Sequence, residues 1–266
     1  MKKRKFSATF TAMKELEPLV KAQYPNVKTG TEVTETYLDF LKNEYNSDLS
    51  KMLFATSLCC DDINVSTDFR RVLTRPFSMG GLGGLPFSGF TGMVAFAHHV
   101  PDGGDAFIFY GPHIGMTDDG QLGKMRRPGQ KQLTNSCGAL MLALQRLQQA
   151  DEVYVPINSE LDYQQTLLER TVMPYKQRIL TSANPAKEIT DVAYEEIHKK
   201  LSILIRMSKK EFHCDRIFLL GGVIVNTSPE YEDAVEVRNF QMVDTRELND
   251  TVPYFSILES EAFKNL

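Results

Sequence analysis

The sequence has no tryptophan, only four cysteines and no long hydrophobic run. Four cysteines among 266 residues are too few for the disulfide framework of a small secreted protein, so we expect the thiols to be free for metal binding or catalysis. The charged start, Met1-Lys-Lys-Arg-Lys-Phe6, resembles that of a signal peptide, but the following segment is too short and too polar for its apolar core. No apolar stretch approaches the roughly 20 residues that a membrane-spanning helix needs. We therefore expect a protein of a reducing compartment that does not cross a membrane.

A strong net charge is also missing. Thirty Lys and Arg residues against 34 Asp and Glu residues give a formal charge of -4, which provides no basic footprint for nucleic acid or anionic lipid. The 42% of hydrophobic residues and 24% of charged residues are ordinary for a globular protein and exclude global disorder. The length fits a single domain. We expect residues 1–50 to form a polar, helical segment packed on a catalytic core of residues 51–266.

The hydrophobic pattern mixes strands and helices. Short apolar runs predict strands at residues 52–59, 93–97, 106–110, 216–225 and 234–243. Apolar residues at three- and four-residue spacing predict helices at residues 34–45, 69–73, 137–147, 162–180 and 187–208, and the first of these is preceded by a similar pattern from Phe6 to Val20. Pro101-Asp-Gly-Gly104 is typical of a hairpin turn between two strands. The pattern predicts an α/β fold with one sheet covered by helices, and it gives no strand order.

Residues 80–92 contain six of the 17 glycines. Glycine lets the backbone adopt positive φ and approach other groups closely. The stretch does not match a phosphate-binding loop, because it has no Gly-Lys-Ser/Thr ending, and Pro86 stands where a dinucleotide-binding fingerprint needs its third glycine. Nucleotide binding is therefore disfavoured.

Three residues with soft donor atoms stand at the ends of predicted elements. Cys59 ends a strand, His113 follows another strand, and Cys137 begins a helix, where the helix dipole favours its thiolate. Zinc binds thiolate sulfur and imidazole nitrogen, and a catalytic zinc site uses three protein ligands and leaves a fourth position for water. These residues are the candidate ligands, although their spacing matches no short zinc motif.

Each candidate also has a purely structural interpretation. A single cysteine at the end of an apolar strand is often a small buried hydrophobic residue. Cys60 should point to the opposite face of the strand from Cys59. The remaining Cys214, and the pair His98-His99, are alternatives that packing or backbone hydrogen bonding would explain equally well. The residues alone leave these alternatives open.

Several strings together resemble one known family, the limiting-carbon-dioxide-inducible protein B/C family. The resemblance is carried by Cys59-Cys-Asp-Asp-Ile-Asn64, Phe77-Ser-Met-Gly-Gly-Leu-Gly-Gly-Leu-Pro-Phe-Ser-Gly-Phe-Thr-Gly92, His98-His-Val-Pro-Asp102, Tyr110-Gly-Pro-His-Ile-Gly115 and Asn135-Ser-Cys-Gly-Ala139. They lie in about residues 52 to 145. The family includes theta-class carbonic anhydrases, whose core and zinc site are similar to those of the beta class. The resemblance implies a mixed, largely parallel central sheet covered by helices, and a homodimer.

The resemblance also implies a function and a set of roles. Zn²⁺ held by Cys59, His113 and Cys137 would activate water for the reversible hydration of carbon dioxide to bicarbonate. Asp61 would orient that water, with an arginine holding its carboxylate. Beta-class enzymes carry this arginine two residues after the aspartate, where this chain has Ile63, so we expect Arg71 or its neighbour Arg70 to supply it. The glycine-rich stretch, with Phe87 and Phe90, would wall a small apolar pocket.

Two other functions fit the same residues. One is a catalytically silent relative that binds partners in inorganic-carbon uptake. The other is a cysteine hydrolase, with Cys137 as nucleophile and His113 as base. The expected location is the cytoplasm, or the plastid stroma if the source is an alga and a transit peptide has been removed.

Overall fold

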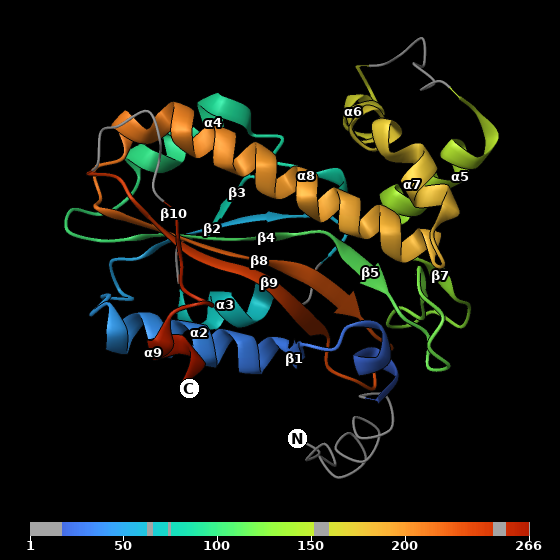
Figure 1. The fold of residues 1–266 in the computed structure, drawn as a ribbon, viewed down its shortest axis with the longest axis horizontal. Helices are drawn as coiled ribbons and strands as arrows, with labels where there is room; N and C mark the ends of the chain where they lie inside the picture. Colours follow the sequence, from blue (N-terminus) through green and yellow to red (C-terminus); the bar gives the residue numbers. More distant parts are fainter. Residues whose placement is uncertain (1–17, 63–65, 74–75, 152–159, 247–253, 266) are drawn as a thin grey trace.

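In the computed structural model, which describes residues 18–62, 66–73, 76–151, 160–246 and 254–265, an eight-stranded sheet forms the centre of the molecule (Figure 1). The main path of the sheet runs β1 (Val27–Thr29), β9 (Ala234–Asp244), β8 (Arg216–Asn226), β4 (Ala106–Gly111), β2 (Leu53–Leu58) and β3 (Pro76–Ser78). Two short strands lie off this path: β10 (Tyr254–Ser256) pairs with β9, and β5 (His113–Gly115) pairs with β8. A separate ribbon joins β6 (Lys124–Met125) and β7 (Thr134–Asn135).

The middle of the sheet is parallel. β3, β2, β4 and β8 pair in parallel, β5 continues parallel to β8, and β9 is antiparallel to β8, β1 and β10. Every residue of β2 and β4 is buried, which explains their continuous apolar sequences, since both faces of a parallel sheet are covered. The predicted mixed, largely parallel sheet is confirmed.

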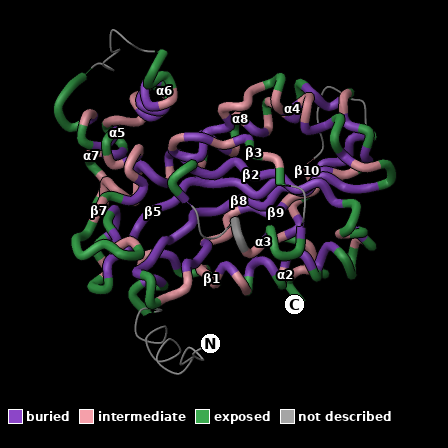
Figure 2. Tube along the Cα trace, turned by 180° about the vertical axis from the view of Figure 1, so that it is seen from behind, coloured by how far each residue is buried: buried purple, intermediate pink, exposed green. Residues whose placement is uncertain are grey.

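Helices cover both faces of this sheet. One face carries the helices α4 (Gly89–His98), α5 (Gly138–Gln149), α6 (Tyr163–Val172), α7 (Lys176–Thr181) and α8 (Pro185–Ser208), with α8 the longest. The opposite face carries α2 (Gly30–Glu44), α3 (Ser66–Val72) and α9 (Glu261–Lys264). Single helical turns lie at η1 (Leu82–Gly84), η2 (Met173–Tyr175) and η3 (Lys209–Glu211). Figure 2 shows the buried sheet between the two more exposed helical layers.

Side chains along β2 point alternately to the two faces of the sheet and so contribute to two separate hydrophobic clusters. Leu53 and Ala55 pack under α4 and α8, whereas Phe54 and Leu58 pack toward α2 and α3. The strand thus presents odd-numbered residues to the first face. Cys59, the residue after β2, belongs to the same cluster as Leu53 and Ala55. Strand geometry therefore sends the Cys59 sulfur to the face that α5 and α8 cover.

Most sequence predictions for the core elements are confirmed. β2, β4, β8 and β9 and the helices α5 and α8 coincide with predicted runs to within a few residues. The helix predicted at residues 162–180 is divided into α6, η2 and α7, and Pro174 lies at the division because it cannot donate the next helical hydrogen bond.

The prediction of a strand at residues 93–97 is wrong. These residues lie in the middle of α4, where Met93, Phe96 and Ala97 are buried. A short apolar run does not distinguish a buried strand from a buried helix, and here the run belongs to a helix. The turn at Pro101–Gly104, with a bond from Gly104 N to Pro101 O of 2.9 Å, therefore joins α4 to β4 and not two strands.

The N-terminal part contributes to the same sheet. β1 pairs with the first residues of β9, and α2 begins directly after β1 with a capping box between Thr29 and Glu32. The helical pattern predicted before Val20 falls mainly on residues 1–17, which lie outside the described residues. The division at residue 50 stays a prediction.

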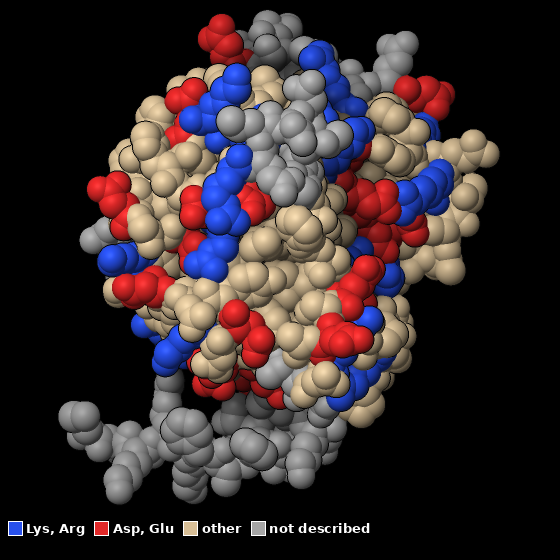
Figure 3. Space-filling model, turned by 60° about the vertical axis from the view of Figure 1, so that its left-hand side comes forward, with Lys and Arg blue, Asp and Glu red and all other residues tan. Residues whose placement is uncertain are grey.

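Within the described part of the chain, no helix combines the length and the apolar character needed to cross a membrane. On the face shown in Figure 3, Lys and Arg side chains are interspersed with Asp and Glu side chains. That face therefore shows no continuous basic patch of the kind that binds a nucleic-acid backbone.

The glycine-rich stretch packs tightly against backbone. Gly84 has a φ of 84°, and a Cβ at this position would lie 2.6 Å from the Gly111 carbonyl oxygen and 3.0 Å from Ile197. Phe87 packs edge-on against Tyr163, and Phe90 is 44% exposed. These contacts indicate that Gly84 permits close packing of two backbone segments. The proposed apolar pocket wall of Phe87 and Phe90 stays a prediction.

We predict that Gly84→Val lowers the free energy of unfolding by about 3 kcal/mol, because a β-branched residue would have to adopt positive φ and would collide with the Gly111 backbone. Urea denaturation monitored by circular dichroism measures this loss. Gly103→Val is the control, since Gly103 also has positive φ (68°) but a Cβ there meets no atom within 4 Å. An equal loss for both variants would show that the collision with Gly111 does not occur.

Candidate metal centre

Cys59 lies at the C-terminal end of β2 and is 3% exposed. Its sulfur accepts a hydrogen bond from the Gly83 backbone N–H at 3.2 Å. The glycine-rich stretch therefore does reach the candidate site, but through its backbone. Hydrogen bonding to Cys137 and burial raise the pKa of the Cys59 thiol, and His113 nearby offsets only part of this rise.

His113 begins β5, where it pairs with Ile224 of β8, and it is 1% exposed. Its Nδ1 lies 2.5 Å from the Asn226 side-chain oxygen. Its Nε2 is buried without a hydrogen bond of good geometry, although the Asp61 carboxylate lies directly against it as an ion-pair partner. The nitrogen that remains available therefore faces Asp61 and the two cysteines.

Cys137 is the N-cap of α5 and is fully buried. Its sulfur lies 3.4 Å from the Cys59 sulfur. Two zinc–sulfur bonds of about 2.3 Å at a tetrahedral angle would separate the sulfurs by about 3.8 Å. The observed spacing is close to this value.

The predicted ligands Cys59, His113 and Cys137 therefore meet, and Asp61 joins them. One donor atom from each of these four residues lies within 4.8 Å of every other. Two buried thiols, a buried imidazole nitrogen without a good hydrogen bond and a partly exposed carboxylate form a donor set that a metal ion fits. Among the described residues this is the one cluster of this kind.

Asp61 lies on the open side of the cluster, with 37% of its side chain exposed. It faces His113 through one carboxylate oxygen, and the other oxygen lies 3.4 Å from the Gly138 backbone N–H at the start of α5. Burial raises the pKa of Asp61, but hydrogen bonding to His113 and the charge of its ring outweigh burial, so the pKa lies below its usual range. Asp61 can therefore serve as an ionised acceptor beside the cluster.

The protonation of His113 responds to the same neighbours. Burial lowers the pKa of its imidazole, but Asp61, and after it Cys59, raise the pKa by more, so the net shift is well above the usual value. Without a metal ion the ring therefore favours the protonated form. A bound cation at Nε2 would replace that proton, so we expect metal binding to release protons.

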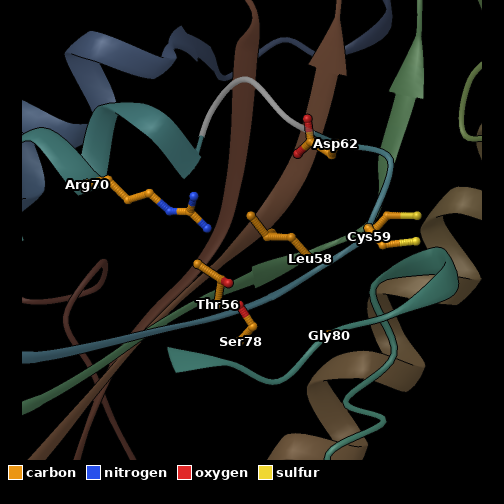
Figure 4. Close-up of a pocket in the computed structure, with 8 residues that line it drawn as sticks. Thr56, Leu58, Cys59, Asp62, Arg70, Ser78 and Gly80 are labelled. Atoms are coloured by element: carbon orange, nitrogen blue, oxygen red, sulfur yellow. The ribbon is translucent and has the colours of Figure 1, made fainter. Parts of the chain in front are cut away.

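The structure does not bring Arg71 to Asp61. Arg71 pairs with Asp68 at 3.2 Å and 70% of its side chain is exposed, because α3 turns Phe69 toward the core and Arg71 toward solvent. Arg70 instead lines a cavity of about 280 Å³ with Thr56, Cys59, Asp62 and Ser78, a lining that does not include Asp61. Figure 4 shows Arg70 extending from α3 toward Thr56, on the side away from the Cys59 sulfur.

Among the described residues, the arginine that contacts Asp61 is Arg127, which the sequence prediction missed. Its Nη2 lies 3.6 Å from Asp61 Oδ2, and its Nη1 donates to the Asn135 carbonyl oxygen at 3.0 Å and to the Thr134 hydroxyl. Arg127 belongs to the loop inserted between His113 and Cys137. The available signal was the pair Arg126-Arg127 in a loop that joins two predicted ligands.

A small cavity of about 50 Å³ lies beside Asp61 under this loop. It is lined by Asp61, Asp62, Met125, Arg127, Pro128, Ser136 and Asn226. The Ser136 hydroxyl and one Asp62 oxygen are buried there without hydrogen-bond partners. Because buried polar atoms need partners and the cavity is large enough for water, it is suited to hold a few water molecules or a very small substrate.

The alternative thiols and histidines lie outside the cluster. Cys60 is exposed, and the buried Cys214 donates to the Arg216 carbonyl oxygen at 3.4 Å. His98 pairs with Glu211 at 3.0 Å, and His99 contacts the Ala95 carbonyl oxygen at 2.6 Å. These contacts give Cys214, His98 and His99 structural roles, and Cys60 faces solvent.

Comparison with known proteins agrees with the fold. A family model described as limiting CO2-inducible proteins B/C beta carbonic anhydrases matches residues 29–244. No curated protein matches the chain.

Solved structures are similar over nearly the whole chain. PtLCIB4, a homolog of the limiting CO2-inducible protein LCIB, has 28% sequence identity and a TM-score of 0.81, covering 90% of this chain and 98% of that chain. A histidine-to-alanine mutant of PtLCIB4 gives 27% identity and a TM-score of 0.82, covering 95% of this chain and 100% of that chain. LCIB itself, at 19% identity and a TM-score of 0.60 over 87% of this chain and 95% of that chain, shows the fold alone.

Proposed function

The chain belongs to the family of limiting CO2-inducible proteins B/C beta carbonic anhydrases, and from this premise we propose that it is a zinc-dependent carbonic anhydrase. The proposed reaction is the reversible hydration of carbon dioxide to bicarbonate. The observation that carries the proposal is the meeting of Cys59, His113 and Cys137, far apart in the sequence, with Asp61 on the open side.

The donor set favours zinc among common metal ions. Thiolate sulfur and imidazole nitrogen suit zinc, whereas magnesium and calcium prefer oxygen ligands. Cys59, His113 and Cys137 would hold the ion, all three being nearly or fully buried. Zinc, when bound, supplies an activated water near neutral pH by lowering the pKa of that water toward about 7.

The other residues of the site would orient and exclude water. Asp61, ionised and partly exposed, can accept a hydrogen bond from a water beside the cluster and fix its orientation. Arg127 would hold the Asp61 carboxylate from the loop side. The cavity of about 50 Å³ beside Asp61 offers space for a three-atom substrate. We propose Arg127 for the role that the sequence assigned to Arg71 or Arg70.

Two measurements together test the proposal. The purified protein should contain about one zinc per chain, and stopped-flow measurements with a pH indicator should show carbon dioxide hydration above the uncatalysed rate. Removal of zinc with a strong chelator should abolish this hydration, and added Zn²⁺ should restore it. A cytoplasmic or plastid location would keep the two thiols reduced, as zinc binding requires.

The same measurements separate the alternatives. A protein that holds zinc but gives only the uncatalysed rate is the silent relative. A metal-free protein that hydrolyses esters and is inactivated by iodoacetamide is the cysteine hydrolase. Either result overturns the carbonic anhydrase proposal.

We also propose that the protein is a homodimer. Exposed apolar side chains at the start of α6, namely Leu161, Tyr163 and Leu167, support an interface there. Light scattering should give twice the chain mass of 30.1 kDa, and a monomer would contradict this proposal.

A further inference from the structure

A single side-chain amide connects His113 to two buried carboxylates. The Asn226 oxygen lies 2.5 Å from His113 Nδ1, and the Asn226 nitrogen donates to Asp62 Oδ1 at 3.1 Å and to Asp233 Oδ2 at 3.0 Å. Asn226 is 3% exposed, Asp62 is 7% exposed and Asp233 is 8% exposed. The connection is therefore shielded from solvent along its length.

The residues of this hydrogen-bond network lie in or directly beside strands of the sheet. Asn226 is the last residue of β8 and pairs with Gly115 of β5, the strand that His113 begins. Asp233 directly precedes β9 and accepts a hydrogen bond from the Thr227 backbone N–H at 2.8 Å. Asp62 follows the segment that carries Cys59 and Asp61. The Asn226 amide therefore stands between three separate backbone segments.

The two carboxylates determine which way this amide points. The Asp62 and Asp233 oxygens that face Asn226 accept hydrogen bonds, so the side-chain nitrogen must face them. A reversed amide would place its oxygen against two carboxylate oxygens, with no hydrogen between the facing atoms. The Asn226 oxygen must therefore face His113.

The amide orientation in turn determines the state of the imidazole. An oxygen acceptor 2.5 Å from Nδ1 requires the proton on Nδ1. Nε2 is then the nitrogen that can give up its proton to a metal ion, and it faces Asp61 and the cysteine sulfurs. The consecutive residues Asp61 and Asp62 thus act on opposite sides of one ring, Asp61 directly at Nε2 and Asp62 through Asn226 at Nδ1.

We propose that Asn226, oriented by Asp62 and Asp233, is a positioning residue that fixes His113 in the tautomer able to bind a metal ion through Nε2. The inference rests on the proposed function only in taking His113 as a zinc ligand. Residues that hydrogen-bond to metal-binding histidines typically change metal affinity by about 10- to 100-fold when they are replaced.

The first test compares zinc affinity in two matched variants by competition with a chromophoric chelator. Asn226→Leu should weaken zinc binding by about 10- to 100-fold. Asn239→Leu is the control, because Asn239 is a buried amide on the adjacent strand β9 that donates a hydrogen bond to Tyr110. The zinc affinity of this control variant should stay within about 3-fold of the wild type. Unchanged affinity in folded Asn226→Leu, or an equal loss in both variants, would overturn the proposal.

A triple variant tests rescue. Asn226→Asp combined with Asp62→Asn and Asp233→Asn keeps an oxygen acceptor facing His113 and replaces both carboxylates that face position 226 with amides that can donate to it. It should bind zinc within about 3-fold of the wild type. If this variant binds as weakly as Asn226→Leu, a hydrogen-bond acceptor at position 226 is not what matters, and the proposal fails.

A third readout needs no variant and applies even if Asn226→Leu does not fold. In zinc-loaded wild-type protein with ¹⁵N-labelled histidine, NMR should show a solvent-protected proton on Nδ1 of His113. A proton on Nε2 would contradict the proposal. Zinc affinity and the NMR signal do not depend on turnover, so a protein that meets these expectations yet fails to hydrate carbon dioxide would refute only the proposed function.

Discussion

Replacing Cys137 with serine should abolish stoichiometric zinc binding and reduce the kcat/KM for carbon dioxide hydration by about 1000-fold or more. The fully buried Cys137 sulfur lies 3.4 Å from the Cys59 sulfur, and no other described thiol lies in the cluster to replace it. A serine hydroxyl is a poor zinc ligand because it is not ionised near neutral pH and is harder than a thiolate. Metal analysis and stopped-flow hydration measure the two effects.

Two cysteine variants serve as controls for this loss. Cys60→Ser changes an exposed thiol next to Cys59, and Cys214→Ser changes a buried thiol that bonds to the Arg216 backbone. Both should keep zinc and activity close to wild type. Full activity in Cys137→Ser, with normal zinc content, would remove the candidate centre as the source of catalysis.

Replacing Asp61 with asparagine should lower kcat by about 10²- to 10⁴-fold while zinc stays bound. Asparagine has nearly the same size but carries no charge, and its amide can present an N–H donor to the water in place of an acceptor oxygen. The three ligands Cys59, His113 and Cys137 remain, so metal content should not fall. If the variant loses zinc together with activity, Asp61 acts mainly as a ligand, and the orienting role proposed for it is wrong.

The arginine partner of Asp61 is tested by three parallel alanine variants. Arg127→Ala should lower kcat by about 10- to 100-fold, because it removes the guanidinium 3.6 Å from the Asp61 carboxylate. Arg71→Ala should have little effect, since its exposed side chain pairs with Asp68. A large loss in Arg71→Ala or Arg70→Ala, with normal activity in Arg127→Ala, would restore the assignment made from the sequence.

The sequence predicted those parts of the site that depend on local position. Cys59 and Cys137 stand where a strand ends and a helix begins, and their surrounding patterns were strong enough to locate both boundaries. His113 follows the strand run of β4, and the structure places it at the start of the short strand β5. The family resemblance added the roles, and the geometry brings these three donors together.

The parts that the sequence did not predict depend on contacts between distant segments. Arg127 reaches Asp61 only because the loop after β5 folds back over the cluster, and Asn226 meets His113 only because β5 pairs with β8. Neither residue has a motif, and neither lies near its partner in the chain. The error at residues 93–97 has a different cause, since a short run of apolar residues without a clear periodicity fits a strand or a helix equally well.

The placement of the donors also affects when the site can form during folding. Cys59, His113 and Cys137 become neighbours only after β2, β4 and β8 have paired in register and α5 has docked. Zinc fingers differ, because their ligands lie close together in the sequence and the ion can organise a short chain directly. Here long-range strand pairing precedes ion capture, so refolding speed should be governed by sheet topology, and zinc should slow unfolding without accelerating refolding.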